Sequence, residues 1–301
     1  PDIIIAGLAR ILDLEYESVD SVYRERADLA MEQTPQRDLT FCPGCPHRAS
    51  YWLLNEALTL NNRQGFVCGD IGCYTLGAAE CGFKTVKLSM SMGSGMGMAS
   101  GFGKLAQFGF DQPSMAICGD STFFHAVMPA LVNAIHNQSD TILVVVDNSG
   151  TAMTGFQPHP GTPMGANKNP LPALNIPDLC RTMGAHVAIS DPFDMEQTRS
   201  LLQEMLEETK GVRVLVLKQD CALSPGKKGR KSFEVMVDPA LCLAEDCGCN
   251  RLCTRVFKCP GLRVDPESQK ASIDDVICTG CGVCASICPA GAIKKERRSR
   301  S

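Results

Sequence analysis

The stretch "CTGCGVCASICPAGAI" restricts what this chain can fold into more than any other part of its sequence. It places Cys278, Cys281, Cys284 and Cys288 in the pattern C-x2-C-x2-C-x3-C-P. With this spacing, three thiolates of one tight loop can bind a cubane 4Fe–4S cluster, while the fourth cysteine, followed by Pro289, is directed to a second cluster. A zinc site rarely needs the final Cys-Pro pair, so the pattern favours iron–sulfur chemistry.

A second, less regular group of cysteines precedes this motif and also ends in Cys-Pro. The stretch "CLAEDCGCNRLCTRVFKCPG" contains Cys242, Cys247, Cys249, Cys253 and Cys259. By the crossed ligation of two-cluster ferredoxins, Cys259 joins Cys278, Cys281 and Cys284, and Cys288 joins three of the other four upstream cysteines. The sequence leaves open which of Cys242, Cys247, Cys249 and Cys253 is not a ligand. We therefore predict two 4Fe–4S clusters in a small α+β domain of the bacterial ferredoxin type at residues 239–295.

The overall composition indicates a reducing compartment. The chain has 17 cysteines in 301 residues, and their close spacing suits metal clusters better than a disulfide framework. Its net charge of −4 gives no reason to expect nucleic-acid or membrane binding. No apolar run approaches the roughly 18 residues that cross a bilayer, and no signal peptide is evident. We expect a cytoplasmic protein without nucleic-acid or membrane partners.

Residues 41–222 alternate between apolar strands and helical patterns. Strands are predicted at 65–69, 85–89, 114–118, 141–147, 186–190 and 212–218, helices at 48–60, 93–108, 123–138 and 195–209, and a long loop at 149–175. Apolar runs such as "TILVVV" are typical of strands buried on both faces. They predict an α/β fold with a mainly parallel sheet and helices on both faces.

The flanking segments have different compositions. Residues 1–40 carry charges and a helical pattern but no core of their own, and are expected to be a linker or the trailing edge of a missing domain. Residues 223–238 have the composition of a linker. Residues 296–301 are expected to be a disordered basic tail.

Two polar residues follow neighbouring strands of the predicted sheet. Asp120 follows the strand at 114–118 and Asn148 follows the strand at 141–147, with a helix between them. Carboxyl ends of parallel strands share one edge, where open α/β sheets bind ligands. A carboxylate and an amide oxygen suit a hard cation such as Mg²⁺, and a helix N-terminus beside them favours a diphosphate. Taken singly, Asp120 could instead cap the next helix and Asn148 could form a turn.

The pair resembles the thiamine diphosphate motif, in which Gly-Asp-Gly is followed at a similar interval by Asn. Here Gly119, Asp120 and Ser121 precede Asn148, with Ser121 in place of the second glycine. The resemblance implies that Asp120, Asn148 and the Gly150 carbonyl hold the Mg²⁺ ion that anchors the cofactor's diphosphate.

Longer motifs resemble one family. "FCPGCPHRASYW", "GDIGCYTLG", "GDSTFFH" and "DNSGTAMTGFQPHPGTP", followed by the two-cluster ferredoxin module, look like the large (alpha) subunit of indolepyruvate:ferredoxin oxidoreductase over residues 41 to about 295. The resemblance implies a thiamine diphosphate-binding fold and oxidative decarboxylation of a 2-oxoacid, expected to be an arylpyruvate such as indolepyruvate, to acyl-CoA and CO₂. Coenzyme A is the implied co-substrate and ferredoxin the implied electron acceptor. Which 2-oxoacid is used, and the direction of the reaction in the cell, stay open.

The resemblance also implies partners. Family members carry an extra N-terminal half with the pyrimidine-binding domain, whose Glu activates the cofactor. That half is expected from a separate chain or from another part of a longer subunit, and the small (beta) subunit completes a hetero-oligomer. The alternative function is an iron–sulfur electron-transfer subunit of another redox complex with a non-catalytic thiamine-type scaffold. Asp120 and Asn148 argue against that alternative.

A third group of cysteines is spread along the thiamine-type domain. Cys42 and Cys45 form a C-x2-C loop, Cys73 lies in "DIGCY", and Cys221 follows the strand at 212–218. In related 2-oxoacid:ferredoxin oxidoreductases, four cysteines in this order bind a 4Fe–4S cluster beside the thiazolium, so the resemblance implies a third cluster. Alternatively, the loop is redox-active and the single cysteines fill the core.

The remaining candidates are glycines and histidines. Gly93, Gly95 and Gly97 precede or begin a helix, and either let the backbone approach the cofactor or serve helix packing. His47 and His125 are the candidates for acid–base catalysis. His47 could equally cap a helix, while His125 lies four residues after Ser121, where it could face the substrate carbonyl.

Overall fold

The computed structural model describes residues 2–35, 38–208, 210–227, 229–244 and 248–298. The chain divides into two compact units, Pro1–Leu39 and Thr40–Ser301. The first unit contains α1 (Asp2–Ile11) and α2 (Ser21–Gln33). Of its described residues, only Ala9 is buried. In the part of the chain that the structure describes, no helix is both long and apolar enough to cross a membrane.

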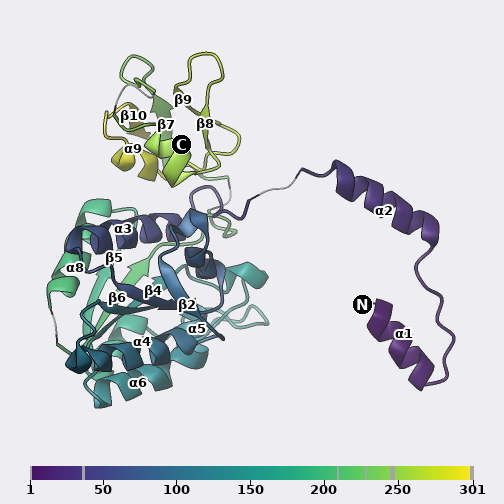
Figure 1. Ribbon diagram of the computed structural model, residues 1–301, viewed down its shortest axis with the longest axis horizontal. Helices are drawn as coiled ribbons and strands as arrows, with labels where there is room; N and C mark the ends of the chain where they lie inside the picture. The colour runs from purple at the N-terminus through teal and green to yellow at the C-terminus, as the bar shows by residue number, and fades with distance from the viewer. Residues whose placement is uncertain (1, 36–37, 209, 228, 245–247, 299–301) are drawn as a thin grey trace. The chain divides into compact units, whose positions relative to one another are not determined.

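The second unit is built on a six-stranded parallel sheet with the order β2-β1-β3-β4-β6-β5 (Figure 1). The strands are β1 (Phe66–Gly69), β2 (Val86–Ser89), β3 (Ser114–Gly119), β4 (Thr141–Asp147), β5 (His186–Ser190) and β6 (Val212–Lys218). The chain runs outward from β1 to β2 and then returns to the other side of β1 to form β3. The strand order therefore reverses between β1 and β3, and open α/β sheets bind ligands beyond the carboxyl ends of strands at such a point.

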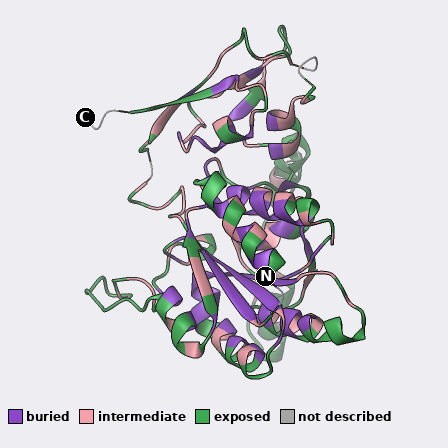
Figure 2. Cartoon of the chain, turned by 90° about the vertical axis from the view of Figure 1, so that its left-hand side faces the viewer, coloured by how far each residue is buried: buried purple, intermediate pink, exposed green. Residues whose placement is uncertain are grey.

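Helices cover both faces of this sheet (Figure 1), and the inner strands β1, β3, β4 and β6 are largely buried (Figure 2). The helices of one face are α3 (Pro46–Asn61) and α8 (Met195–Glu207), and those of the other are α4 (Ser94–Lys104), α6 (Met128–His136) and α7 (Ile176–Met183). Side chains of β4 alternate between the two cores, with Val144 in the first and Val145 in the second. Burial on both faces is the reason for the unbroken apolar run, and the predicted α/β fold is confirmed.

Short helical segments connect these elements. η1 (Cys73–Ala78), η2 (Glu80–Gly82), η3 (Leu105–Phe108) and η5 (Ala152–Thr154) are 3-10 turns. After β3, α5 (Asp120–Thr122), the π-helical η4 (Phe123–Val127) and α6 form one continuous helical stretch. Single π-turns inside helices are frequent at functional sites.

The cysteine-rich segment forms two small antiparallel sheets. β7 (Phe233–Val237) pairs with β10 (Ile293–Arg297), and β8 (Leu262–Val264) pairs with β9 (Ala271–Ile273). α9 (Val283–Ile287) and the π-helical η6 (Cys253–Phe257) carry cysteines of the two motifs. The apolar core continues from this module to α3, where the rings of Phe257 and Trp52 meet edge to face with centroids 5.6 Å apart.

Three segments differ from the sequence prediction. The linker predicted at 223–238 contains β7, which pairs with β10. The composition of the segment could not indicate this strand, because its partner lies far along the chain. The basic tail predicted at 296–301 overlaps the end of β10. Its charged residues are compatible with a strand, because charged side chains are typical of edge strands. Residues 299–301 lie outside the described residues. Helix α7, which was not predicted, follows the long loop.

Candidate cofactor and cluster sites

The carboxyl ends of the central strands bring polar segments together. Asp70 follows β1, Asp120 follows β3, Asn148 follows β4, and Cys221 lies shortly after β6. The Gly150 N–H donates to Oδ2 of Asp120 at 3.0 Å, which joins the loops after β3 and β4. The Cys221 N–H donates to the Asn148 carbonyl at 3.2 Å, which joins the loops after β4 and β6. The edge that the sequence predicted for ligand binding is thus one connected structure.

Asp120 lies at the centre of this edge and is 3% exposed. Its Oδ1 accepts the Ser121 N–H at 2.8 Å. Nε2 of His159 lies 3.2 Å from Oδ2 of Asp120, off the line of a hydrogen bond. Nδ1 of His159 accepts the Gly161 N–H at 3.1 Å, which places the proton of the neutral ring on Nε2, facing Asp120. The sequence analysis missed His159, although it belongs to the motif "DNSGTAMTGFQPHPGTP".

The oxygens around Asp120 fit a hard cation. Oδ1 of Asn148 is buried, and it has no hydrogen-bond partner among the described residues. Burial, and then the charge of Asp120, raise the pKa of Asp147. A buried, unpaired amide oxygen is costly without a ligand, and amide and carboxylate oxygens are the donors that Mg²⁺ prefers. Asp120 and Asn148 therefore fit the predicted metal; the role of the Gly150 carbonyl stays a prediction.

A second buried carboxyl group lies at the reversal point of the sheet. Asp70 follows β1, and burial raises its pKa to about 6, although hydrogen bonding from Tyr74 and the nearby N–H groups of Gly93 and Gly95 opposes the shift. The N–H groups of Gly93 and Gly95 lie near the Asp70 carboxyl group but not in hydrogen-bonding geometry. Oδ2 of Asp70 therefore has no hydrogen-bond partner within the described part of the chain. The Tyr74 hydroxyl donates to Asp70 and lies 3.0 Å from Oγ1 of Thr122. This contact connects the ends of β1 and β3.

The two predicted histidines lie in different environments. His47 is buried in α3, and burial lowers its pKa to about 4 while the charge of Asp120 partly opposes the shift. Its Nδ1 has no hydrogen-bond partner among the residues that are described. His125 is exposed on η4. His47 is therefore a neutral ring within electrostatic reach of Asp120, and the proposed catalytic roles of both histidines stay predictions.

The candidate glycines at the start of α4 and before α5 differ in how closely they pack. Gly93 has φ +82°, and a Cβ there would lie 2.3 Å from the Ala126 side chain. A Cβ at Gly95 would approach the Cys68 carbonyl oxygen at 3.0 Å, whereas a Cβ at Gly97 would meet nothing within 4 Å. A Cβ at Gly119 would lie 2.9 Å from the Tyr74 ring. Helix packing accounts for Gly93 and Gly95, and contact with a cofactor stays a prediction for all of them.

The cysteines of the ferredoxin module form two groups. Burial raises the pKa of the Cys284 thiol, and the charges of Cys281, Cys259 and Cys278 raise it further. Burial raises the pKa of Cys253 to about 11, and the charges of Cys288, Cys249 and Cys242 add to the shift. Thiols that influence one another in this way lie close together, because charge interactions fall off with distance. The first group is the set predicted for one cluster.

The second group bears on the choice that the sequence left open. Its described members are Cys242, Cys249, Cys253 and Cys288. Four thiolates suffice for one cluster, and the choice of the three upstream ligands that join Cys288 stays a prediction. Cys247, the fourth upstream candidate, lies outside the described residues.

The third set of cysteines also comes together. Burial raises the pKa of Cys45 to about 12, and the charges of Cys42 and Cys221 contribute. Burial raises the pKa of Cys73, again with contributions from Cys221 and Cys42. None of the four forms a disulfide. Four thiols from three separate loops therefore lie within reach of one another's charge. Four cysteine thiolates are the donor set of a 4Fe–4S cluster, and the third cluster stays a prediction. Cys68, Cys81, Cys118 and Cys180 are buried core residues.

These sets do not have the arrangement of a mononuclear site. Within the described residues, no three His, Cys, Asp or Glu side chains are grouped to hold a single metal ion. The assignment to clusters therefore rests on motif spacing and on the mutual influence of the thiols.

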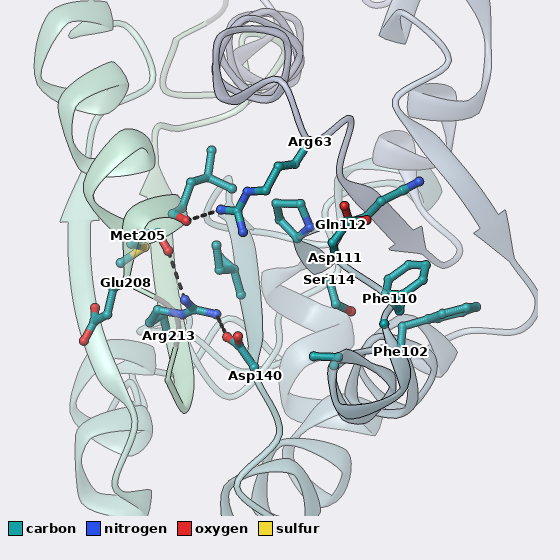
Figure 3. A pocket seen from close by; sticks show the side chains of 16 residues that line it. Arg63, Phe102, Phe110, Asp111, Gln112, Ser114, Asp140, Met205, Glu208 and Arg213 are labelled. Atoms are coloured by element: carbon teal, nitrogen blue, oxygen red, sulfur yellow. Dashed lines mark hydrogen bonds and ion pairs between the residues drawn. The ribbon is translucent and has the colours of Figure 1, made fainter.

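A cavity of about 400 Å³ lies at the opposite edge of the sheet (Figure 3). It is lined by residues at the amino ends of β3, β4 and β6, including Ser114, Asp140 and Arg213. Arg213 forms an ion pair with Asp140 and donates to the Met205 carbonyl at 3.1 Å. None of the predicted site residues lines this cavity in the described part of the chain, so it is separate from the candidate cofactor site.

Comparison with protein families assigns both domains. Residues 70–217 match the thiamine pyrophosphate enzyme family, C-terminal TPP binding domain. Residues 271–294 match the 4Fe-4S binding domain family. The first match includes Asp120 and Asn148, and the second includes the cysteines from Cys278 to Cys288.

Comparison with curated proteins finds a consistent set of relatives. The indolepyruvate oxidoreductase subunit IorA of Pyrococcus horikoshii is 36% identical over 315 residues, which cover 97% of this chain and 46% of the relative. IorA of Methanothermobacter thermautotrophicus is 39% identical over 267 residues, 87% of this chain and 41% of the relative. The chain thus spans about half the length of the curated relatives it matches.

Comparison with solved structures agrees on the fold. The 2-oxoglutarate:ferredoxin oxidoreductase from Magnetococcus marinus superimposes with a TM-score of 0.51 at 16% identity, covering 64% of this chain and 67% of that one. At this identity the likeness concerns the fold alone.

Proposed function

Because the chain is homologous to the C-terminal portion of the large subunit of indolepyruvate:ferredoxin oxidoreductase, we propose that it is the cofactor-binding and electron-transfer part of a 2-oxoacid:ferredoxin oxidoreductase. The proposed reaction is oxidative decarboxylation of an arylpyruvate, with indolepyruvate as the first candidate, to acyl-CoA and CO₂. Coenzyme A accepts the acyl group and ferredoxin accepts the electrons. The relatives' name supports the substrate class.

One contact carries this proposal. The Cys221 N–H donates to the Asn148 carbonyl at 3.2 Å, so a predicted cluster ligand and a predicted metal ligand belong to directly bonded loops. An enzyme that decarboxylates and then passes electrons on needs its cofactor and its first electron acceptor close together. A scaffold without a cofactor would have no need for this arrangement.

The chain's own residues have distinct tasks in the proposed site. Asp120 and Asn148 would hold the Mg²⁺ that anchors the diphosphate, and the N–H groups of Ser121 and Gly150 keep the Asp120 carboxylate oriented. The proton on Nε2 of His159 faces the same carboxylate. His47 is held neutral by burial, which lowers its pKa to about 4. When bound, thiamine diphosphate supplies the carbanion chemistry and the iron–sulfur clusters take up electrons singly.

Three clusters are proposed for the electron path. Their ligands are Cys42, Cys45, Cys73 and Cys221 for the first, Cys259, Cys278, Cys281 and Cys284 for the second, and Cys242, Cys249, Cys253 and Cys288 for the third. The grouping of the thiols supports these sets. Such clusters are maintained in a reducing compartment, which supports a cytoplasmic location.

The proposed assembly has more components than this chain. The chain covers 46% of the length of the Pyrococcus horikoshii relative. We therefore propose that the pyrimidine-binding half, with the Glu that activates the cofactor, comes from a separate chain or from another part of a longer subunit. A small (beta) subunit completes the proposed hetero-oligomer.

The test uses the complete anaerobically purified complex that contains this chain. Reduction of a viologen dye should require a 2-oxoacid, coenzyme A, Mg²⁺ and thiamine diphosphate together, and an acyl-CoA should form at one per two electrons. Values of kcat/KM for indolepyruvate, pyruvate and 2-oxoglutarate identify the substrate. A complex that contains clusters but binds no thiamine diphosphate would instead favour the electron-transfer scaffold.

A further inference from the structure

Arg48 is a fully buried cation between the two cysteine-rich parts of the second unit. It lies on the first turn of α3, three residues after Cys45, and is 2% exposed. Its guanidinium donates to the Phe257 carbonyl at 2.7 Å and to the Phe41 carbonyl at 2.5 Å. It also donates to Oγ1 of Thr40 at 3.1 Å. The carbon of the guanidinium lies over the Phe41 and Phe257 rings, 5.7 and 5.6 Å from their centroids.

These contacts leave the charge of Arg48 without an acidic partner. In the described residues, Arg48 makes no ion pair, and its Nε has no hydrogen-bond partner. A buried arginine is strongly destabilising unless a negative charge lies near it. Arg213, which is also buried, has such a charge in Asp140. The position of Arg48 therefore calls for a negative charge that carboxylates do not supply.

The groups near Arg48 that can carry a negative charge are cysteines, as thiolates bound to a cluster. Burial lowers its pKa, and the charges of Cys259, Cys45, Cys81 and Cys42 oppose the shift, in that order. Cys259 belongs to the ferredoxin group, while Cys45 and Cys42 belong to the group at the carboxyl edge of the sheet. Cys81 belongs to neither group.

Contacts between the loop at Cys42 and the ferredoxin motif also place Arg48 between the two groups of cysteines. A Cβ at Gly44 would lie 2.0 Å from Oγ1 of Thr279, the residue after Cys278. The loop between Cys42 and Cys45 therefore packs directly against the ferredoxin motif. Phe257, which accepts the hydrogen bond from Arg48, lies two residues before Cys259.

We propose that Arg48 is a positioning residue for electron transfer, whose fixed charge stabilises the reduced forms of the clusters on both sides of it and holds the two modules at a constant separation. The inference rests on the proposed function. In the step concerned, the cluster that Cys42, Cys45, Cys73 and Cys221 would hold would be oxidised by one electron. The cluster that Cys259, Cys278, Cys281 and Cys284 would hold would be reduced by that electron, with ferredoxin as the final acceptor. Arg48 transfers no proton, because a guanidinium stays protonated in proteins.

The expected effect follows from Coulomb's law. At an effective dielectric constant near 20, a unit charge within roughly 12 Å changes a one-electron equilibrium by about tenfold or more. A tenfold change corresponds to about 59 mV for one electron. For a cluster within that distance, removal of the charge should lower the midpoint potential by at least about 59 mV. We expect this shift for the two clusters beside Arg48, and a smaller one for the cluster of Cys242, Cys249, Cys253 and Cys288.

The experiment compares Arg48→Met, Arg48→Gln and Arg48→Lys in the anaerobically purified holoenzyme. Iron analysis and redox titration followed by electron paramagnetic resonance give the cluster number and the potentials. Arg48→Met is expected to lower two potentials, and Arg48→Lys to keep them near the wild-type values because it keeps the charge. Arg48→Gln also removes the charge but retains an N–H donor for one of the two carbonyls. It replaces Arg48→Met in the test if the Met variant does not assemble. Arg213→Gln is the matched control, since it removes a second buried arginine at the opposite edge of the sheet (Figure 3).

The outcomes separate this inference from the proposed function. Wild-type potentials in assembled Arg48→Met or Arg48→Gln, with only lower thermal stability, would overturn the electrostatic role. Equal shifts in Arg213→Gln would also overturn it. Absence of the cluster at Cys42, Cys45, Cys73 and Cys221 from the wild-type holoenzyme would remove both the three-cluster path and this inference. Dye reduction that needs no thiamine diphosphate, with shifted potentials, would sink the proposed function while supporting the role of Arg48.

Discussion

Replacement of Asp120 by Asn tests the candidate metal site with the smallest change of shape. The carboxylate accepts N–H groups of Ser121 and Gly150 and lies 3.2 Å from Nε2 of His159. An amide has only one acceptor oxygen, so one of these donors must face an NH₂ group. Leaving one buried hydrogen bond unmade costs about 1–3 kcal/mol. The removal of charge near Asp147, whose pKa Asp120 helps to raise, offsets part of this cost.

The effect on cofactor binding should be larger. Loss of an outer partner of a metal site typically costs about 10–100-fold in affinity. Since Asp120 is proposed as a direct ligand, Asp120→Asn should weaken the binding of thiamine diphosphate with Mg²⁺ by at least about 100-fold, or about 2.7 kcal/mol. The unfolding free energy should fall by no more than about 3 kcal/mol.

Calorimetric titration of the complete complex with thiamine diphosphate and Mg²⁺ measures the change. Asp111→Asn is the control, because Asp111 is exposed and precedes β3 at its opposite end. Its affinity should equal that of the wild type. An Asp120→Asn complex with wild-type iron content and an affinity within about threefold of the wild type would refute the assignment of Asp120 as a metal ligand.

Three further outcomes are expected. Cys73→Ser should lower the iron content from about twelve to about eight atoms per chain and leave the ferredoxin signals unchanged; anaerobic iron analysis decides this, and eight atoms in the wild type would refute it. The isolated chain should not reduce viologen with indolepyruvate and coenzyme A, since it spans only 46% of its relative, and turnover at the rate of the full complex would contradict this. His47 has a pKa of about 4 in the folded chain against 6.5, so the unfolded state gains protons first as the pH falls. Between pH 6.5 and pH 4 the unfolding free energy of the wild type should therefore fall by about 3 kcal/mol because of His47. His47→Gln should not show this part of the fall, and denaturant unfolding at several pH values measures it.

The sheet and the position of its ligand-binding edge could be predicted from the sequence. A strand buried on both faces is apolar throughout, as in β4, and strands separated by helices pair in parallel. The carboxyl ends of β3 and β4 then share an edge, which places Asp120 and Asn148 together without any knowledge of side-chain packing. These predictions succeeded because they depend on local pattern and chain connectivity.

His159 could not be predicted in the same way. It lies in a long loop without periodicity, and contacts within the loop and beyond it fix its position. Its ring stacks on Phe124 with centroids 5.6 Å apart, and its backbone N–H donates to Oγ1 of Thr162 at 3.1 Å. The burial of Arg48 was equally hidden, because the partners of its guanidinium lie in distant parts of the sequence.

Helix α7 did have a signal that was overlooked. Asn175 caps the helix by accepting the Asp178 N–H at 3.0 Å, and Pro177 stands in the first turn. Asn before Pro near an apolar stretch is a common start of a helix. The choice among the upstream cysteines is different, because their irregular spacing allows several sets of ligands. This choice stays a prediction, since Cys247 lies outside the described residues.

The hydrogen bond between Arg48 and Phe257 also has a consequence for how the chain folds. The two residues are 209 positions apart, so this contact closes a loop that includes almost the whole thiamine-type domain. Contacts between residues so far apart in the sequence form late in folding, because the chain between them must first be ordered. During synthesis, the loop at Cys42 leaves the ribosome long before the surface that covers it. The first turn of α3 therefore stays unfinished until the last module has folded, and a truncation before that module would expose a buried cation and its apolar surroundings to aggregation.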